Sequence, residues 1–224
     1  MISRVDVRHP GVGRAHAIAL ATSLVLAGCF RGSLPPRQFY RLIPPEPPTL
    51  ASATAPPLAG SMSIRRYETP GIYASGALVY RVGSSTYGEY PAREWAIPLG
   101  EMLGSMSEAV IARRSLASGR VVFDPSATER QQFEWRGSVR EFDEVDTPTS
   151  VSASVALDAK LIRVADDSVI WSGSVREVVP VAQSRSMDAV VAGLSVAASR
   201  AIAKLTDDAA ATLRRLAAAG AQDR

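Results

Sequence analysis

Three segments in the second half of the chain carry an apolar residue at every second position, and this alternation constrains the fold more than any other feature. The segments span residues 132–145, 150–164 and 168–179. The alternating residues are Phe133, Trp135 and Val139, then Val151, Ala153, Val155, Leu157, Ala159 and Leu161, and then Val169, Trp171, Gly173 and Val175. Such a period of two is typical of a β-strand with one buried face. A turn at Ala165–Ser168 joins the last two segments, so an antiparallel meander is predicted.

The residues between these apolar positions predict the character of the opposite face. In the middle segment they include Ser152, Ser154, Asp158 and Lys160. This face is therefore expected to contact water. An acidic cluster near the first turn comprises Glu141, Asp143, Glu144 and Asp146. Because it lacks the glycine turn and the spacing of a calcium loop, we interpret it as the solvated end of a hairpin, and no metal site is predicted.

Two stretches show the three-to-four spacing of an amphipathic helix. The first lies within residues 93–114 and places Trp95, Leu99, Met102, Leu103, Met106 and Val110 on one face. Its regular part is predicted to start near Ile97, with Pro98 in the first turn and Trp95 as a clamp at its beginning. The second stretch has Ser186 as N-cap, Asp188 in the first turn, and Val191, Leu194, Ala198, Ile202 and Leu205 along one face. From Asp207 onward it is expected to project.

Shorter strands are predicted at residues 38–43, 61–71, 77–83 and 119–125. Residues 44–60 contain six prolines and form either a polyproline spacer or a crossover that lets the first strand rejoin the sheet. Residues 84–92 are predicted to be a loop that carries Tyr87 and Tyr90. The sum is an α+β fold, a mainly antiparallel β-sheet with two α-helices packed on one face.

The only cysteine of the 224 residues follows an export signal. Arg4, Arg8 and Arg14 precede an apolar run of about 11 residues, whereas a spanning helix needs roughly 20. The tetrapeptide Leu26, Ala27, Gly28, Cys29 resembles the bacterial lipobox, in which the signal peptidase recognises the first three residues and the cysteine receives lipid. Cys29 is therefore predicted to be a membrane anchor, because two or three acyl chains hold a soluble domain firmly.

This signal divides the chain into four predicted parts. They are the lipoprotein signal peptide (1–28), the lipidated N-terminus with the first strand and the proline-rich linker (29–60), the α+β domain (61–213) and a tail (214–224). Resemblance to known lipoproteins, with Phe30 rather than Asp after the cysteine, implies sorting to the outer membrane, facing the periplasm.

Composition argues against an enzyme. Both histidines, His9 and His16, lie in the signal peptide, and the only thiol is used by the lipid. The mature chain therefore lacks the groups for Ser-His-Asp or Cys-His catalysis and for a zinc site, and no cofactor is predicted. One enzymatic alternative is a carboxylate-based hydrolase that uses two of Glu134, Glu141 and Asp158. Cleavage leaves 22 basic and 21 acidic residues, a net charge of +1 that gives no reason to expect nucleic acid as a partner.

Several short motifs, taken in order, resemble one family. After the lipobox come "FYRL", "ALVYRV", "REWAIPLGEML", "VREFDE" and a glycine in the final strand, and the likeness extends from Cys29 to about Leu213. These features resemble the ABC-type transport auxiliary lipoproteins, the group that includes the paraquat-inducible protein C type. The proline stretch and the residues after Leu213 have no clear counterpart in that family.

The resemblance implies a non-enzymatic subunit of an intermembrane transport system for lipids or other apolar compounds. Its partners would be an MCE-domain protein and an ABC permease and ATPase, and a homo-oligomer is left open. Of the matching residues, Trp95, Pro98 and Leu99 are assigned to the fold. The possible contact residues are Tyr80, Arg81, Tyr87 and Tyr90. The alternative is an envelope assembly or chaperone lipoprotein that binds lipopolysaccharide or outer-membrane proteins.

Overall fold

The computed structural model describes residues 36–43, 55–125, 130–181 and 186–222 of the chain. The predicted signal peptide and Cys29 lie outside these residues. Within them the chain forms eight β-strands and two α-helices, so the α+β prediction is confirmed. The strands are β1 (Gln38–Tyr40), β2 (Met62–Ile64), β3 (Ala77–Val82), β4 (Thr86–Trp95), β5 (Val121–Phe123), β6 (Phe133–Asp146), β7 (Val151–Arg163) and β8 (Ser168–Pro180). The α-helices are α2 (Leu99–Arg113) and α3 (Met187–Gln222), and a 3-10 turn, η2 (Gly71–Ala74), precedes β3.

The predicted meander of β6, β7 and β8 is confirmed. Strand β7 pairs antiparallel with β6 along its whole length and with β8 on its other side. The apolar positions of β7 that were predicted from the period of two are buried, from Val151 to Leu161. The positions on the opposite face are exposed to water only in part. Lys160 is exposed, as predicted, but Ser154 is fully buried.

The other edge of β6 is shared by two groups of short strands. Strand β2 pairs with the beginning of β6, where Met62 lies opposite Phe133, and β3 pairs with its end, where Tyr80 lies opposite Glu144. Both pairings are parallel. Strand β5 adds to β2 in parallel, while β4 adds to β3 antiparallel and β1 adds to β4 in parallel. The sheet is therefore mixed, with antiparallel pairing among the long strands β6, β7 and β8 and between β3 and β4.

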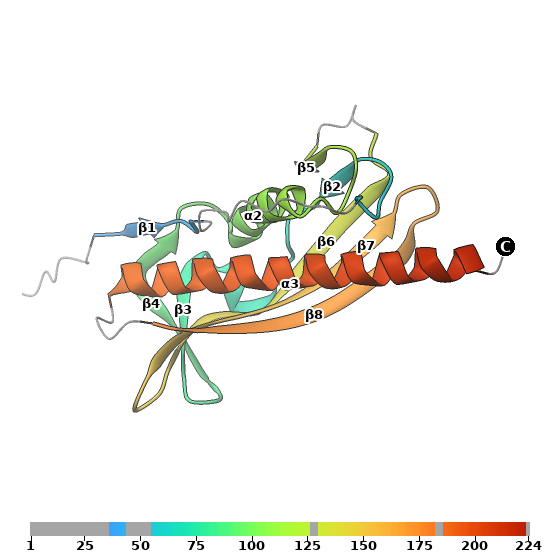
Figure 1. Cartoon of the computed structure of the whole chain (residues 1–224). Coiled ribbons are helices and arrows are strands. Elements are labelled where there is room, and N and C mark those ends of the chain that lie inside the picture. The colour runs from blue at the N-terminus through green and yellow to red at the C-terminus, as the bar shows by residue number, and fades with distance from the viewer. Residues whose placement is uncertain (1–35, 44–54, 126–129, 182–185, 223–224) are drawn as a thin grey trace, which may run out of the picture. The chain divides into compact units, whose positions relative to one another are not determined.

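Both helices cover the same face of the sheet (Figure 1). Trp135 of β6 and Trp171 of β8 stack on this face with ring centroids 5.4 Å apart. The Trp135 indole donates to the hydroxyl of Tyr67, which also contacts the hydroxyl of Ser107 on α2. The Trp171 indole donates to Asp208 on α3. These contacts tie each helix to the layer of tryptophans, and fully buried small residues such as Ala198 let α3 lie close to the sheet.

The helix boundaries agree with the predicted caps, with two corrections. The backbone N–H of Ala189 donates to Ser186, the predicted N-cap of α3, and α2 begins directly after Pro98. Trp95, however, belongs to the end of β4, where its ring meets that of Phe142 edge-on. Helix α3 continues to Gln222, and packing extends past Asp207 because Ala209 and Ala210 are buried.

Helix α3 is long and apolar enough to cross a membrane by length and composition. However, 67% of its most apolar window is buried inside the domain. That burial is typical of the core helix of a globular domain.

The proline-rich stretch connects two strands of one sheet. Before it, β1 pairs with β4, Leu42 is 7% exposed, and the N–H of Ile43 donates to the Ser195 hydroxyl of α3. After it, β2 pairs with β5 and β6 of the same sheet. The strands before and after the stretch thus lie in one sheet, as the crossover alternative predicts. Residues 44–54 themselves lie outside the described residues.

The predicted loop at residues 84–92 is wrong, because most of it forms β4. Gly88 and Pro91 suggested a break, but both have places in the strand. A side chain at Gly88 would overlap the ring of Tyr80 directly opposite, so glycine is required by the pairing. Pro91 lies in a bulge, where the register shifts between Ala77 and Val79 and a missing N–H breaks no ladder bond.

Candidate partner-binding surface

The four predicted contact residues lie on the β3–β4 hairpin and divide between its two faces. Arg81 lies opposite Tyr87, and Tyr80 lies opposite Gly88, in an antiparallel register that closes at Gly83 with a positive φ of 65°. Tyr80 also lies beside Glu144 of β6, whose cross-strand partner Ala153 packs under α3. Tyr80 therefore faces the helix side of the sheet, and Arg81 and Tyr87 face the helix-free side.

Arg81 is buried in a network of ion pairs. It is 8% exposed, its Nε donates to Asp143 at 2.8 Å, and a second nitrogen lies 3.3 Å from Glu141. Asp143 is fully buried and also accepts a hydrogen bond of 3.0 Å from the hydroxyl of Tyr73. The Tyr87 ring lies over the Arg81 guanidinium, 5.7 Å from ring centroid to Cζ. Arg81 thus holds the hairpin onto β6 and offers little surface to a partner.

Burial and charge act in opposite directions on this pair. Burial raises the pKa of Asp143, and the hydrogen bond and charge of Arg81 oppose that rise without cancelling it. For Arg81, burial disfavours the charged form, yet the hydrogen bond and charge of Asp143 outweigh it and raise the pKa. Each group therefore depends on the other, as expected for a buried ion pair.

The acidic cluster is not the solvated hairpin end that was predicted. Strand β6 continues to Asp146, so Glu141, Asp143 and Glu144 sit within the sheet, and the turn is formed by residues 147–150. Glu141 accepts a hydrogen bond from Ser154 at 3.0 Å and pairs with Arg176 at 3.0 Å. Within the described residues, no group of three or more His, Cys, Asp or Glu side chains could hold a metal ion.

Tyr80 and Tyr90 form a half-buried aromatic pair on the other face, with centroids 4.9 Å apart. The Tyr90 hydroxyl donates to Glu144 at 2.8 Å, and Arg93 lies over the Tyr90 ring. Burial and the hydrogen bond to Glu144 raise the Tyr90 pKa, so this phenol stays protonated. The pair therefore stabilises the base of the hairpin.

The exposed apolar surface of the hairpin is near its tip. Val82 is 50% exposed and Tyr87 is 43% exposed. The tips of the β3–β4 and β6–β7 hairpins extend to the same side, beyond the helices (Figure 1). The N–H of Gly83 donates to the Asp146 carbonyl between them. A shallow hollow of about 520 Å³ is lined by Val82, Gly83, Asp146, Thr147 and Pro148. These residues, together with Tyr87 on the opposite face of the same hairpin tip, form what we call the hairpin-tip surface.

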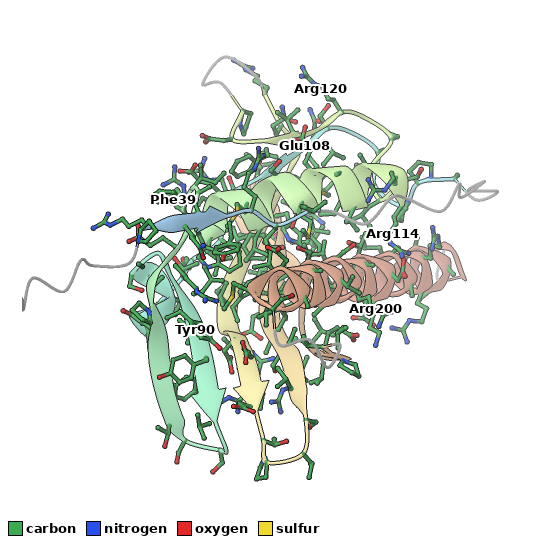
Figure 2. All side chains as sticks on the ribbon, turned by 90° about the vertical axis from the view of Figure 1, so that its left-hand side faces the viewer. Phe39, Tyr90, Glu108, Arg114, Arg120 and Arg200 are labelled. Carbon is green, nitrogen blue, oxygen red and sulfur yellow. The ribbon has the colours of Figure 1, made fainter. Side chains whose placement is uncertain are left out.

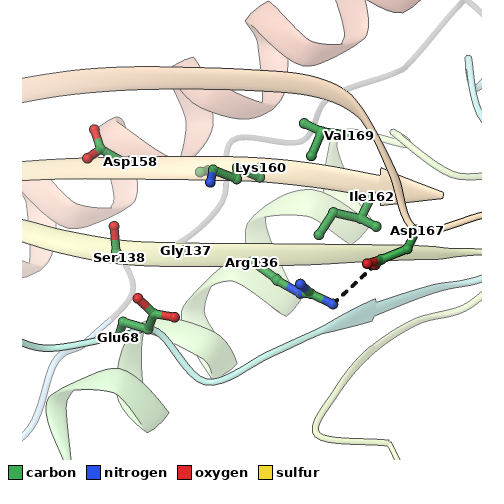
Figure 3. A pocket seen from close by; sticks show the side chains of 10 residues that line it. Glu68, Arg136, Gly137, Ser138, Asp158, Lys160, Ile162, Asp167 and Val169 are labelled. Atoms are coloured by element: carbon green, nitrogen blue, oxygen red, sulfur yellow. Dashed lines mark ion pairs between the residues drawn. The ribbon is translucent and has the colours of Figure 1, made fainter. Parts of the chain in front are cut away.

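A second hollow lies on the helix-free face (Figure 3). It has a volume of about 260 Å³, and its polar lining includes Glu68, Arg136, Ser138, Asp158, Lys160 and Asp167. Of the three carboxylates proposed for a hydrolase, only Asp158 lines it. All three are paired with arginine: Glu134 with Arg65 and Arg136, Glu141 with Arg81 and Arg176, and Asp158 with Arg140. A paired acid and base for glycoside hydrolysis is therefore not assembled here.

Sequence reasoning missed three members of the Arg81 network. Ser154 and Arg176 occupy polar positions of alternating strands, and Tyr73 lies between two of the predicted strands. Ser154 was counted as solvent-facing. In the fold Ser154 is fully buried and contacts both Glu141 and Arg176, which the alternation alone does not show.

Comparisons with known proteins agree with this fold. The family described as "ABC-type transport auxiliary lipoprotein component" matches residues 40–210. Protein XCC0632 from Xanthomonas campestris is 18% identical, with a TM-score of 0.62 over 81% of this chain and 96% of that one. An uncharacterized protein is 14% identical, with a TM-score of 0.58 over 78% and 99%. The PelC dodecamer protein from Paraburkholderia phytofirmans is 18% identical, with a TM-score of 0.47 over 70% and 93%. No curated protein matches this chain.

Proposed function

Because this chain belongs to the ABC-type transport auxiliary lipoprotein family, we propose that it is a non-enzymatic subunit of an MCE-type system that moves lipids or other apolar compounds between membranes. Its partners would be an MCE-domain protein and the ABC permease and ATPase of the same system. The family match covers residues 40–210 and is the observation that carries this proposal. The paired carboxylates of the helix-free face support a non-enzymatic role.

Cys29 is the proposed attachment to the membrane, and its sequence context favours the outer membrane on the periplasmic side. Replacing Cys29 by alanine should release the protein from the membrane fraction and abolish transport-dependent barrier function. Fractionation of envelopes and a detergent-sensitivity assay measure the two effects. Normal barrier function in a strain that carries only this variant would contradict the tether.

The hairpin-tip surface is the proposed docking site for the MCE-domain protein. Val82 and Tyr87 are exposed there on a hairpin that the Arg81–Asp143 pair holds in place. Partner interfaces favour exposed aromatic residues on a rigid support, because little side-chain entropy is lost on binding. Tyr80 and Tyr90 would support this surface from its base, and Arg81 from the sheet below it.

An affinity pull-down of the lipidated protein from solubilised envelopes tests this assignment. An MCE-domain protein should be recovered with the wild type and with Val164→Ala, and should be depleted with Tyr87→Ala. Val164 is a matched control, since it is 49% exposed and lies in the turn between β7 and β8. Equal recovery with Tyr87→Ala would refute the docking surface. Recovery of only barrel proteins or lipopolysaccharide with the wild type would instead favour the chaperone alternative.

A further inference from the structure

Three exposed apolar residues lie on or next to β1, an edge strand of the sheet. Phe39 is 60% exposed, Ile43 is 71% exposed and Ile97 is 41% exposed. The register of β1 against β4 aligns Tyr40 with Trp95, and the N–H of Ala96 donates to the Tyr40 carbonyl, so Ile97 lies beside the end of β1. Figure 2 shows Phe39 on this outer strand. We call these three residues the β1 apolar patch.

Basic side chains flank Phe39 in this patch. Arg37 and Arg41, two positions before and two positions after it along the chain, are exposed. Glu94, which lies opposite Phe39 in the register, is 3.5 Å from Arg37. The patch therefore carries an excess of positive charge. Apolar residues with a basic border are typical of surfaces that lie at a membrane interface, where arginine meets headgroup phosphates.

The length of the chain before β1 limits how far the patch can lie from Cys29. Arg37 comes eight positions after Cys29, so the two can lie at most about 29 Å apart even when the chain between them is fully extended. Strand β1 in turn is fixed to the domain by its pairing with β4, by buried Leu42 and by the bond from Ile43 to Ser195. The proline-rich crossover comes after β1 and adds nothing to this reach.

Another exposed apolar residue is much farther along the fold. Leu216 is 58% exposed, and it lies 21 residues beyond Ser195 on α3, which corresponds to about 32 Å along a helix. The anchoring point thus favours the β1 end of the domain as the side that meets the membrane.

We propose that the β1 apolar patch rests on the surface of the membrane to which the protein is anchored, with Phe39 and Ile43 in the interfacial region and the arginines on anionic headgroups. The proposal builds on the lipidation of Cys29 given above. A second copy of the chain is a poorer occupant, because an isologous contact would bring the same arginines together. The patch orients the domain and so directs its free surfaces toward partners away from the bilayer.

Site-specific fluorescence tests this orientation in the full-length lipidated protein. Because the native cysteine is used by the lipid, a single new cysteine can be labelled selectively with an environment-sensitive dye. Ile43→Cys probes the patch, and Leu216→Cys is the control. In vesicles of phosphatidylethanolamine and phosphatidylglycerol, the dye at residue 43 should shift to the blue and lose intensity when brominated lipids are included. The dye at residue 216 should do neither.

The outcomes separate this proposal from the anchor itself. If intact mass shows lipid on Cys29 and the dye at residue 43 is not quenched by brominated lipids, the orientation is overturned and the anchor stands. A blue shift without quenching that grows with protein concentration would mean that a second copy covers the patch, which also overturns it. An unmodified Cys29 would overturn both the anchor and the orientation.

Discussion

Replacing Arg81 by alanine should destabilise the domain by about 3–5 kcal/mol, the usual cost of leaving a buried charge without its partner. Asp143 is fully buried, and Arg81 supplies its bond of 2.8 Å, so among the described side chains the variant leaves this carboxylate with the Tyr73 hydroxyl alone. Glu141 is affected less, because Arg176 and Ser154 still contact it. The free energy of unfolding is measured by urea denaturation.

The loss should depend on pH in a defined direction. Burial raises the pKa of Asp143, and without Arg81 nothing of similar strength opposes that rise. An acid whose pKa is higher in the folded than in the unfolded state binds more protons when folded, so stability falls as the pH rises from about 4 through the folded pKa. Each unit of additional shift corresponds to about 1.4 kcal/mol. The deficit of Arg81→Ala relative to the wild type should therefore be largest near pH 8 and should shrink toward pH 5.

Arg176→Ala provides the matched control. Arg176 also pairs with Glu141, but its side chain is 51% exposed, so its removal should cost only about 0–1 kcal/mol with little pH dependence. A deficit of Arg81→Ala that equals that of Arg176→Ala, or that is the same at pH 5 and pH 8, would refute the assignment of Arg81 as a buried structural ion pair.

Three further changes test the packing. Tyr67→Phe leaves the Trp135 indole and the Ser107 hydroxyl without their buried partner and should cost about 1–3 kcal/mol in urea unfolding; an unchanged midpoint would argue against that network. The added methyl group of Gly137→Ala would overlap the Tyr67 ring, so thermal unfolding should show that the domain is less stable by about 1–3 kcal/mol. Truncation after Leu213 removes exposed helix and should change stability by about 0.5 kcal/mol or less; a larger loss would show that the end of α3 packs.

Local patterns were reliable where one residue period persisted over a long segment. The meander from Phe133 to Val179 and both helices follow from their apolar spacing, because a buried face selects the same positions in every turn or pleat. Strand β4 was missed because glycine and proline are usually strand breakers. Glycine is nevertheless the residue that fits at position 88 of the strand, because the Tyr80 ring occupies the space that any side chain would need.

The candidate surface was predicted only in part. Tyr87 was identified as a contact residue and is exposed, but Arg81 was placed in the same group and is buried. Its partner Asp143 is 62 residues away along the chain, and the acidic cluster that contains Asp143 looked like a solvated turn. A charged residue gives no sign in the sequence of whether its neighbour in space is water or an opposite charge.

The sequence by itself determined the long strands, the two helices and the single cysteine in its lipobox, because each depends on residues close together in the chain. The tertiary structure decided that β2 and β3 share one edge of β6 and that β1 and β2, on either side of the proline-rich segment, belong to one sheet. It also decided that Glu134, Glu141 and Asp143 of β6 pair with arginines. These features depend on pairings between distant segments, and such pairings are selected by how well the whole core packs and satisfies its buried polar groups.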